Sequence, residues 1–294
     1  MKLAAIDIGS NAVRLQIVRT VENDPGEEKF KKVEFVRIPV RLGDDAFKDK
    51  YISKEKRKLF TKAMHAFQLM LEAFEVDHYL ACATSAMREA ENGQKIVRKI
   101  EEEFGLKIQI IDGQKESEII LKSISQFFEK GKNYLTIDVG GGSTEMTVIK
   151  DCKIINSVSF DIGTVRAYDG AVKENTWQSI EHWVKHKTIG LEKLEAIVTS
   201  GTINKIFHLI NEDSTDLTFT REQLKSFHRK VSKMSLQERI EQLKLNPDRA
   251  DIIDVSADIY LRILSWANIE KVYAPSNTGL KDGILLHLYD KYNS

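Results

Sequence analysis

The chain has 294 residues, and its 44 lysine and arginine residues balance its 44 aspartate and glutamate residues, so the formal net charge is zero. A chain without net positive charge is a poor candidate for sequence-independent binding of nucleic acid, because many basic groups must then neutralise phosphates. No apolar run reaches the roughly 18 residues that suggest a membrane span, and the N-terminus lacks the pattern of a secretory signal. We therefore expect a cytoplasmic protein of about two domains that binds neither nucleic acid nor membranes.

The two cysteines, Cys82 and Cys152, fit this compartment. Both lie in segments that read as strands, and they do not form a pair with the spacing of metal ligands. We expect both to be reduced and to have a structural role.

The first half of the chain reads as a sheet with helices packed on it. An apolar strand at 3–8 and an alternating strand at 13–18 flank a short polar turn, which predicts a hairpin. A polar loop is expected around 23–27. Further strands are predicted at 33–39, 79–83 and 107–111, and helices at 53–76, 94–104 and after Gly113. The alternation of strands and helices predicts an α/β fold.

The second half begins by repeating the pattern of the N-terminus. Residues 136–149 align with residues 5–18, so that Asp138 matches Asp7 and Gly140 matches Gly9. The chain therefore reads as internally duplicated. Strands are expected again at 152–160, 195–199 and 271–274, and helices at 176–185, 202–211 and 280–289.

Capping signals mark several helix starts in this half. Thr220 with Gln223 and Ser235 with Glu238 have the spacing of a capping box. Pro247 is expected just inside a long helix capped by Asn246. The buried stripe of that helix would be Ile252, Val255, Ile259, Ile263 and Trp266.

Each copy of the repeat places an aspartate at the end of an apolar strand, followed by small residues that turn the chain. Small residues allow backbone N–H groups to approach a phosphate closely. One turn of this kind is weak evidence, because glycine-rich hairpins are common, but two at matching positions predict phosphate binding. The candidates on the two turns are Ser10, Asn11, Gly140, Gly141, Gly142, Ser143 and Thr144.

Acidic side chains beside a phosphate-binding turn favour a bound cation, because carboxylate and phosphate otherwise repel each other. Asp7, Asp138 and Glu145 are the acidic residues at these turns. Carboxylate oxygens suit a divalent cation such as Mg²⁺. We therefore expect a Mg²⁺ site at these three residues.

Four motifs occur in order along the chain: Asp7-x-Gly-Ser-Asn-x-x-Arg14, Ala83-Thr-Ser-Ala-x-Arg88-Glu-Ala-x-Asn92, Ile111-x-Gly113-x-x-Glu116-Ser-Glu118 and Asp138-x-Gly-Gly-Gly-Ser-Thr-Glu145. Further motifs follow at Gly163-x-Val165-Arg166, Ser200-Gly-Thr202, residues 249–253 and Gly279-Leu280-x-x-Gly283. Together they cover nearly the whole chain, which resembles the exopolyphosphatase/guanosine pentaphosphate phosphatase family. Within it the chain is similar to the short, two-domain form, which lacks the extra C-terminal helical domains of longer members.

The resemblance implies an α/β fold of two duplicated actin-like, ribonuclease H-like domains that close on a phosphate-binding cleft. We expect these domains at 1–125 and 126–280, with the C-terminal helix at 281–294 joined to the first. It also implies a phosphohydrolase whose substrate is inorganic polyphosphate, guanosine pentaphosphate or both. A homodimer would be the commonest closed assembly.

The resemblance also implies roles for two carboxylates. Glu116 lies at the position of the family's catalytic glutamate and would be the general base for the attacking water. Asp138, which would hold metal and water, is the second catalytic candidate. Glu118 is the alternative candidate for the general base. Where the family often has two acidic residues and an alanine, this chain has Lys115-Glu116-Ser117.

Among the arginines, Arg88 has the strongest case for phosphate binding, because it follows a strand and a Thr-Ser turn within a family motif. Arg14, Arg41 and Arg166 are weaker candidates. Arg14 lies on a hairpin strand that can face solvent, Arg166 follows a glycine turn in the second half, and Arg41 could equally be an ordinary loop arginine.

Two other functions fit parts of the same pattern. An ATP-dependent kinase of the superfamily would use the same turns, and residues 200–202 could contribute to its nucleotide pocket. A non-catalytic sensor of polyphosphate or an alarmone would also need the turns. A pure binder has no need of the carboxylates at Glu116, Asp138 and Glu145, which argues against the sensor.

Overall fold

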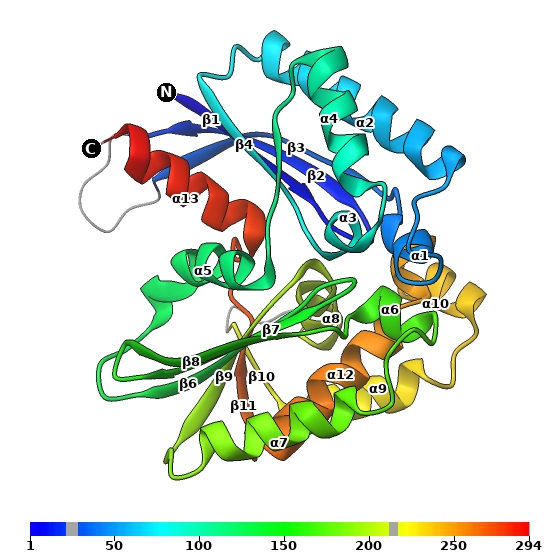
Figure 1. The fold of residues 1–294 in the computed structure, drawn as a ribbon. Coiled ribbons are helices and arrows are strands. Elements are labelled where there is room, and N and C mark those ends of the chain that lie inside the picture. The colour runs from blue at the N-terminus through cyan, green and yellow to red at the C-terminus, as the bar shows by residue number, and fades with distance from the viewer. Residues whose placement is uncertain (22–28, 212–216, 294) are drawn as a thin grey trace. The chain divides into compact units, whose positions relative to one another are not determined.

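The computed structural model describes residues 1–21, 29–211 and 217–293 (Figure 1). Its contacts divide the chain into two units, residues 1–123 with 280–294 (unit 1) and residues 124–279 (unit 2). The loop expected at 23–27 lies outside the described residues. None of the helices in these ranges is long and apolar enough to cross a membrane.

In the described part of unit 1, five strands form one sheet in the order β3-β2-β1-β4-β5. Neighbours among β1, β2 and β3 run antiparallel, whereas β1, β4 and β5 run parallel. The strands are β1 (Lys2–Ile8), β2 (Val13–Thr20), β3 (Phe30–Ile38), β4 (His78–Ala83) and β5 (Ile108–Ile110). The β1–β2 hairpin and the third strand confirm the predicted opening of the chain.

The helices of unit 1 come from both ends of the chain. They are α1 (Leu42–Ala46), α2 (Lys54–Ala73), α3 (Ser85–Glu89), α4 (Gly93–Phe104), α5 (Gly113–Ile124) and α13 (Leu280–Tyr292). Leu280 and Ile284 of α13 share a core with Leu3 of β1 and Ile119 of α5. The two helices approach so closely that a Cβ at Gly283 would lie 1.9 Å from the carbonyl oxygen of Ile119.

In the described part of unit 2, six strands form a sheet in the order β10-β11-β9-β6-β7-β8. The strands are β6 (Asn133–Val139), β7 (Thr144–Lys150), β8 (Lys153–Phe160), β9 (Leu194–Thr199), β10 (Thr218–Thr220) and β11 (Lys271–Tyr273). The helical segments are η1 (Ser125–Phe127), α6 (Thr164–Tyr168), α7 (Thr176–Thr188), α8 (Gly201–Ile210), α9 (Arg221–Val231), α10 (Leu236–Gln242), α11 (Pro247–Ala250) and α12 (Ile253–Trp266).

The two sheets share one topology, as the predicted duplication requires. The order β8-β7-β6-β9-β11 in unit 2 repeats the order and strand directions of β3-β2-β1-β4-β5 in unit 1. A register irregularity also recurs at matching positions, between Ile17 and Val18 in β2 and between Val148 and Ile149 in β7. Strand β10 is an addition to unit 2.

The long helix expected from Pro247 onward is interrupted, so that prediction is wrong. Helices α11 and α12 are separate, and the side chain of Asn246 makes no capping bond. The carbonyl oxygen of Ala250 accepts a hydrogen bond from Arg239 Nη1 at 3.0 Å, and the same guanidinium binds both carboxylate oxygens of Asp254 at 2.8 Å. Arg239 of α10 thus binds a carbonyl and a carboxylate group at the break between the two helices. The sequence around the break does not predict this contact.

The cysteines differ from each other in position. Cys82 is buried in β4, as predicted. Cys152 is exposed in the β7–β8 turn, where Asp151 and Cys152 both have positive φ, at 48° and 61°. Such a two-residue turn matches the twist of the strands that it joins. The strand position predicted for Cys152 is therefore wrong, and its structural role stays a prediction.

Candidate active site

The turn between β1 and β2 is held by hydrogen bonds to its carbonyl oxygens. The carbonyls of Ser10 and Asn11 accept from the main-chain N–H groups of Gly43 and Arg41 at 2.8 and 2.9 Å. The hydroxyl of Ser10 lies 2.9 Å from that of Ser85, and both side chains are buried. With its carbonyls bound to the protein, the turn is suited to offer N–H groups to an anion.

The turn between β6 and β7 is held in a similar way by α6. The first N–H groups of α6 donate to the carbonyls of Gly140 and Gly141 at 2.8 to 3.0 Å. The buried Arg166 donates from Nε to the carbonyl of Gly142 at 2.7 Å. A Cβ at Gly163 would lie 2.5 Å from backbone atoms of Gly141 and Gly142, so the helix start approaches the turn at a distance that only glycine permits.

Two acidic side chains lie beside this second turn. Asp138 and Glu145 are register partners in β6 and β7, so their side chains project from the same face of the sheet. Glu145 is buried, and its Oε1 accepts a hydrogen bond from Ser159 at 2.7 Å. Like charges directly opposite each other destabilise a sheet. The pair therefore favours a cation.

Unit 1 carries different charges at the matching positions. Asp7 and Arg14 are register partners in β1 and β2, and Arg14 Nη1 donates to Asp7 Oδ2 at 2.6 Å. Arginine thus compensates the aspartate of unit 1 at the place where unit 2 has a second carboxylate. The two predicted turns share their geometry and differ in their electrostatics.

The carboxylate of Asp138 is also bound from the neighbouring parallel strand. Thr199, its register partner in β9, donates from Oγ1 to Asp138 Oδ2. The main chain of Thr199 in turn binds Tyr260, a fully buried residue of α12. Burial, followed by the negative charge of Asp138, raises the pKa of Tyr260 far above its usual value, so its hydroxyl stays protonated.

Helix α5 carries Glu116 as a buried carboxylate in its first turn. The side chain of Asp112 accepts from the N–H of Lys115 at 2.7 Å and so fixes the helix start. The helix dipole favours a negative charge at this end. Glu118 is half-exposed and ion-paired with Lys115 at 3.2 Å. Of the two candidates for a general base, Glu116 has the more enclosed position.

Asp7 and Glu116 act on a common neighbour in unit 1. Burial, followed by the negative charges of these two carboxylates, raises the pKa of Cys82 to about 12. Asp7 is the register partner of Cys82 in the β1–β4 pair. A thiol with this pKa is protonated at neutral pH and is a poor nucleophile, so Cys82 is no candidate for covalent chemistry.

Arg88 lies in α3, directly after β4. Its Nη1 donates to the carbonyl of Ile111 at 2.7 Å, which anchors the guanidinium to the segment that leads into α5. Asn92, from the same motif, binds both main-chain groups of Ile52 and is buried. Asn92 therefore holds the segment that carries Arg88.

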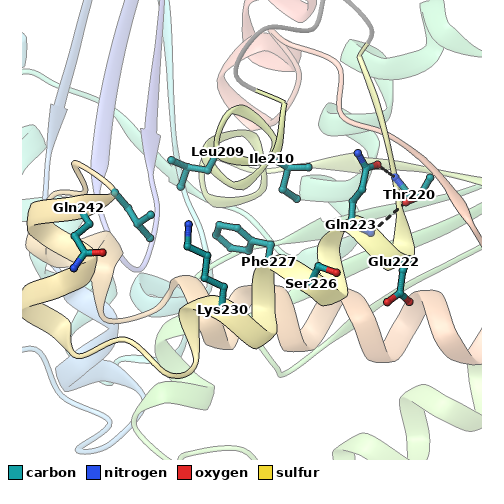
Figure 2. Close-up of a pocket in the computed structure, with 10 residues that line it drawn as sticks. Leu209, Ile210, Thr220, Glu222, Gln223, Ser226, Phe227, Lys230 and Gln242 are labelled. Carbon is teal, nitrogen blue, oxygen red and sulfur yellow. Dashed lines mark hydrogen bonds between the residues drawn. The ribbon is translucent and has the colours of Figure 1, made fainter.

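A surface pocket of about 560 Å³ lies elsewhere in unit 2, between the end of α8, helix α9 and the end of α10 (Figure 2). Its lining combines the apolar Leu209, Ile210 and Phe227 with the exposed Lys230 and Gln242. None of the residues predicted for the phosphate turns, all of which the structure describes, is among those that line it. The pocket is separate from the candidate active site.

Comparisons with known proteins decide the family. The sequence model of the Ppx/GppA phosphatase family matches residues 21–292. The chain belongs to this family.

Solved structures agree in fold. The Ppx/GppA family member of Aquifex aeolicus is 22% identical, with a TM-score of 0.78 over 100% of this chain and 99% of that chain. An exopolyphosphatase from Cytophaga hutchinsonii is 21% identical, with a TM-score of 0.82 over 99% of this chain and 98% of that chain. These similarities confirm the predicted two-domain, actin-like α/β fold.

One curated relative is a larger protein. The bifunctional 3-dehydroquinate synthase/phosphatase of Fusobacterium nucleatum is 28% identical over 314 residues, which cover 96% of this chain and 46% of that protein. This Ppx/GppA chain thus spans about half the length of that relative.

Enzymes of the Ppx/GppA family generally depend on a divalent cation. Asp138 and Glu145 fit such an ion, because both residues offer carboxylate oxygens beside the glycine turn between β6 and β7. Across residues 1–21, 29–211 and 217–293, no three His, Cys, Asp or Glu side chains lie close enough together to hold a metal by themselves. Two carboxylates suffice for Mg²⁺, which usually completes its coordination with water and phosphate oxygens.

Proposed function

We propose that this chain is a divalent-cation-dependent phosphohydrolase that releases terminal phosphate from inorganic polyphosphate or from the 5′ end of guanosine pentaphosphate. Membership of a phosphatase family supports the reaction class. The observation that carries the proposal is the turn between β6 and β7 in unit 2. The N–H groups of α6 bind the carbonyls of this turn, and the acidic pair Asp138 and Glu145 lies beside it.

In this proposal both turns bind phosphate oxygens. Main-chain N–H groups and hydroxyls supply the hydrogen bonds, and the guanidinium of Arg88 supplies positive charge. The residues assigned to this task are Ser10, Asn11, Arg88, Gly140, Gly141, Gly142, Ser143 and Thr144. The N–H of Gly140 and the hydroxyl of Thr144 already donate to the carbonyls of Ser143 and Ile162, so these two groups shape the turn instead of donating to phosphate.

Glu116 acts as the general base. Water attacks the terminal phosphorus, its proton passes to a Glu116 carboxylate oxygen, and the bond to the bridging oxygen breaks. The products are orthophosphate and a substrate shorter by one phosphoryl group. The buried position of Glu116 in the first turn of α5 supports this role.

Asp138 and Glu145 would hold the cation, which would neutralise negative charge on phosphoryl oxygens when bound. Asp138 keeps its predicted catalytic role through this ligation. Asp7 as a third ligand stays a prediction, and its ion pair with Arg14 counts against it.

The test compares Glu116→Gln with Glu118→Gln, which removes one charge from the same helix at a half-exposed position. Phosphate release is measured from polyphosphates of several lengths and from guanosine pentaphosphate, with Mg²⁺ and with a chelator. Glu116→Gln should lower kcat by about 10²- to 10⁴-fold, while Glu118→Gln should stay near wild type. The relative rates on the two substrates identify the preferred one.

Two results would contradict the proposal. One is a wild-type protein that releases phosphate from neither substrate class with Mg²⁺ present. The other is a folded Glu116→Gln variant with the wild-type rate, which would remove Glu116 from the role of base.

A further inference from the structure

The β6–β9 ladder ends one residue earlier than its counterpart in unit 1. The pairing of β1 with β4 continues to Ile8 and Ala83. In unit 2 the last pair is Asp138 with Thr199. The chain leaves β9 through Ser200, whose φ of 138° is one that non-glycine residues rarely adopt. Directly after Asp138, strand β6 therefore has no ladder partner in β9, although Val139 still pairs with Thr144 of β7.

The hydroxyl of Tyr260 stands at the place where the ladder stops. It donates to the carbonyl of Thr199 at 2.6 Å and accepts from the N–H of Val139 at 3.1 Å. It also lies 3.3 Å from the hydroxyl of Ser200. One buried hydroxyl from α12 thus joins the two strands immediately beyond their last pair.

This hydroxyl is linked to the carboxylate of Asp138 through Thr199. Tyr260 binds the main chain of Thr199, and the Thr199 hydroxyl binds Asp138 Oδ2. At the matching place in the described part of unit 1, Cys82 stands opposite Asp7 and cannot supply a strong donor. The Tyr260–Thr199 pair therefore belongs to the aspartate of unit 2 and is not a requirement of the shared fold.

We propose that Tyr260 and Thr199 are positioning residues that hold the Asp138 carboxylate in the orientation in which it binds the divalent cation. The inference rests on the proposed function of Asp138. Neither residue needs to touch the substrate, since each acts through the carboxylate. Hydrogen-bond partners of metal ligands typically change metal affinity or activity by about 10- to 100-fold when removed.

The chain offers a matched control for the loss of the tyrosine hydroxyl. Tyr134 is also fully buried and lies on the same strand as Asp138, near its opposite end. Tyr134→Phe and Tyr260→Phe are the same chemical change at two buried positions of unit 2, and only the second removes a bond to Thr199. For the threonine, Thr199→Val removes the donor, and Thr199→Ser keeps it.

The experiment titrates each purified variant with Mn²⁺ and follows free Mn²⁺ by electron paramagnetic resonance. Tyr260→Phe and Thr199→Val should raise the Kd for Mn²⁺ by about tenfold or more. Tyr134→Phe and Thr199→Ser should stay within about twofold of wild type. The rates of phosphate release should rank the variants in the same order as their Mn²⁺ affinities, and a higher Mg²⁺ concentration should partly restore kcat. Urea unfolding shows which variants are folded.

Wild-type Mn²⁺ affinity in folded Tyr260→Phe and Thr199→Val would overturn the inference, as would a wild-type protein that binds no Mn²⁺. If Tyr260→Phe does not fold, the contrast between Thr199→Val and Thr199→Ser decides. A wild-type protein that binds Mn²⁺ in this Tyr260-dependent way but releases no phosphate would refute the proposed function and leave the inference standing.

Discussion

Arg14 and Glu145 occupy matching positions of the repeat, each directly across a hairpin from an aspartate. The guanidinium of Arg14 compensates Asp7 at 2.6 Å, whereas Glu145 adds a second negative charge beside Asp138. This exchange of arginine for glutamate gives the two copies of the turn different electrostatics. In the proposed function both copies of the turn bind phosphate, and the copy in unit 2 has the acidic pair that favours a cation.

The cysteines allow a residue-scale prediction. Folded protein treated with iodoacetamide at pH 8 should gain one adduct, on the exposed Cys152, as seen by intact mass and peptide mapping. Cys82 should not react, because burial raises its pKa to about 12, which leaves a thiolate fraction of about 10⁻⁴ at this pH. In Cys152→Ser, labelling should appear only after unfolding in urea. An adduct on Cys82 in the folded variant would contradict the burial described for β4.

Local repetition explains which site residues the sequence predicts. Asp7 and Asp138 stand within short motifs that occur twice, so their pattern can be compared within one chain. Arg166, Thr199 and Tyr260 give no such signal. Tyr260 lies 121 residues from Val139, which its hydroxyl binds, and a tyrosine in an apolar helix reads as core. The sequence cannot reveal a contact that only folding creates.

The partners of the three weaker arginine candidates could not be predicted from the sequence either, because the partner of a guanidinium depends on the fold. The structure gives each of them a protein partner: Arg14 binds Asp7, Arg41 binds Asp44, and Arg166 binds the carbonyl of Gly142. Among these, Arg166 gains importance, because it holds the phosphate-type turn in place.

At the scale of elements, periodicity predicted most of the longer helices and strands, and both expected capping boxes form at the starts of α9 and α10. Strand β10 was not predicted, and the helix expected from Pro247 onward is divided into α11 and α12. The short helices α1, α3 and α6 were not predicted. Each has five residues, too few to show a repeating apolar stripe. These helices carry or contact candidate site residues, so the elements nearest to the chemistry are the ones that a sequence pattern describes least well.

The contact between α6 and the glycine turn gives an element-scale prediction. In Gly163→Ala, the new Cβ would lie 2.5 Å from backbone atoms of the turn, so α6 must move away. Phosphate release should fall by on the order of 100-fold, and the free energy of unfolding by about 1–3 kcal/mol.

Gly170→Ala is the control at the other end of α6. Gly170 has a φ of 68°, and a Cβ added there would have nothing within 4 Å, so alanine should cost about 1 kcal/mol of stability without changing phosphate release. Urea unfolding and initial rates measure both effects. A Gly163→Ala variant with the wild-type rate would show that the turn does not need α6.

At the scale of the whole molecule, zero net charge has to be reconciled with polyanionic proposed substrates. Long-range attraction is weak for such a chain, so positive potential must be local. The turn N–H groups, a bound cation and a few fixed arginines can supply it without surplus surface charge. Substrate affinity should then depend on the position of a charge more than on the total number of charges.

Arg88→Gln and the double variant Lys54→Gln/Lys58→Gln test this expectation. Lys54 and Lys58 are exposed on α2, and their replacement removes twice as much positive charge as the change at Arg88. Arg88→Gln should raise KM for phosphate release by about tenfold, equivalent to about 1.4 kcal/mol. The lysine variant should stay within about twofold, because exposed charges are screened by salt. KM is measured from initial rates at about 0.05 and 0.2 M salt. A larger change of KM in the lysine variant than in Arg88→Gln would mean that surface charge, not the fixed arginine, attracts the substrate.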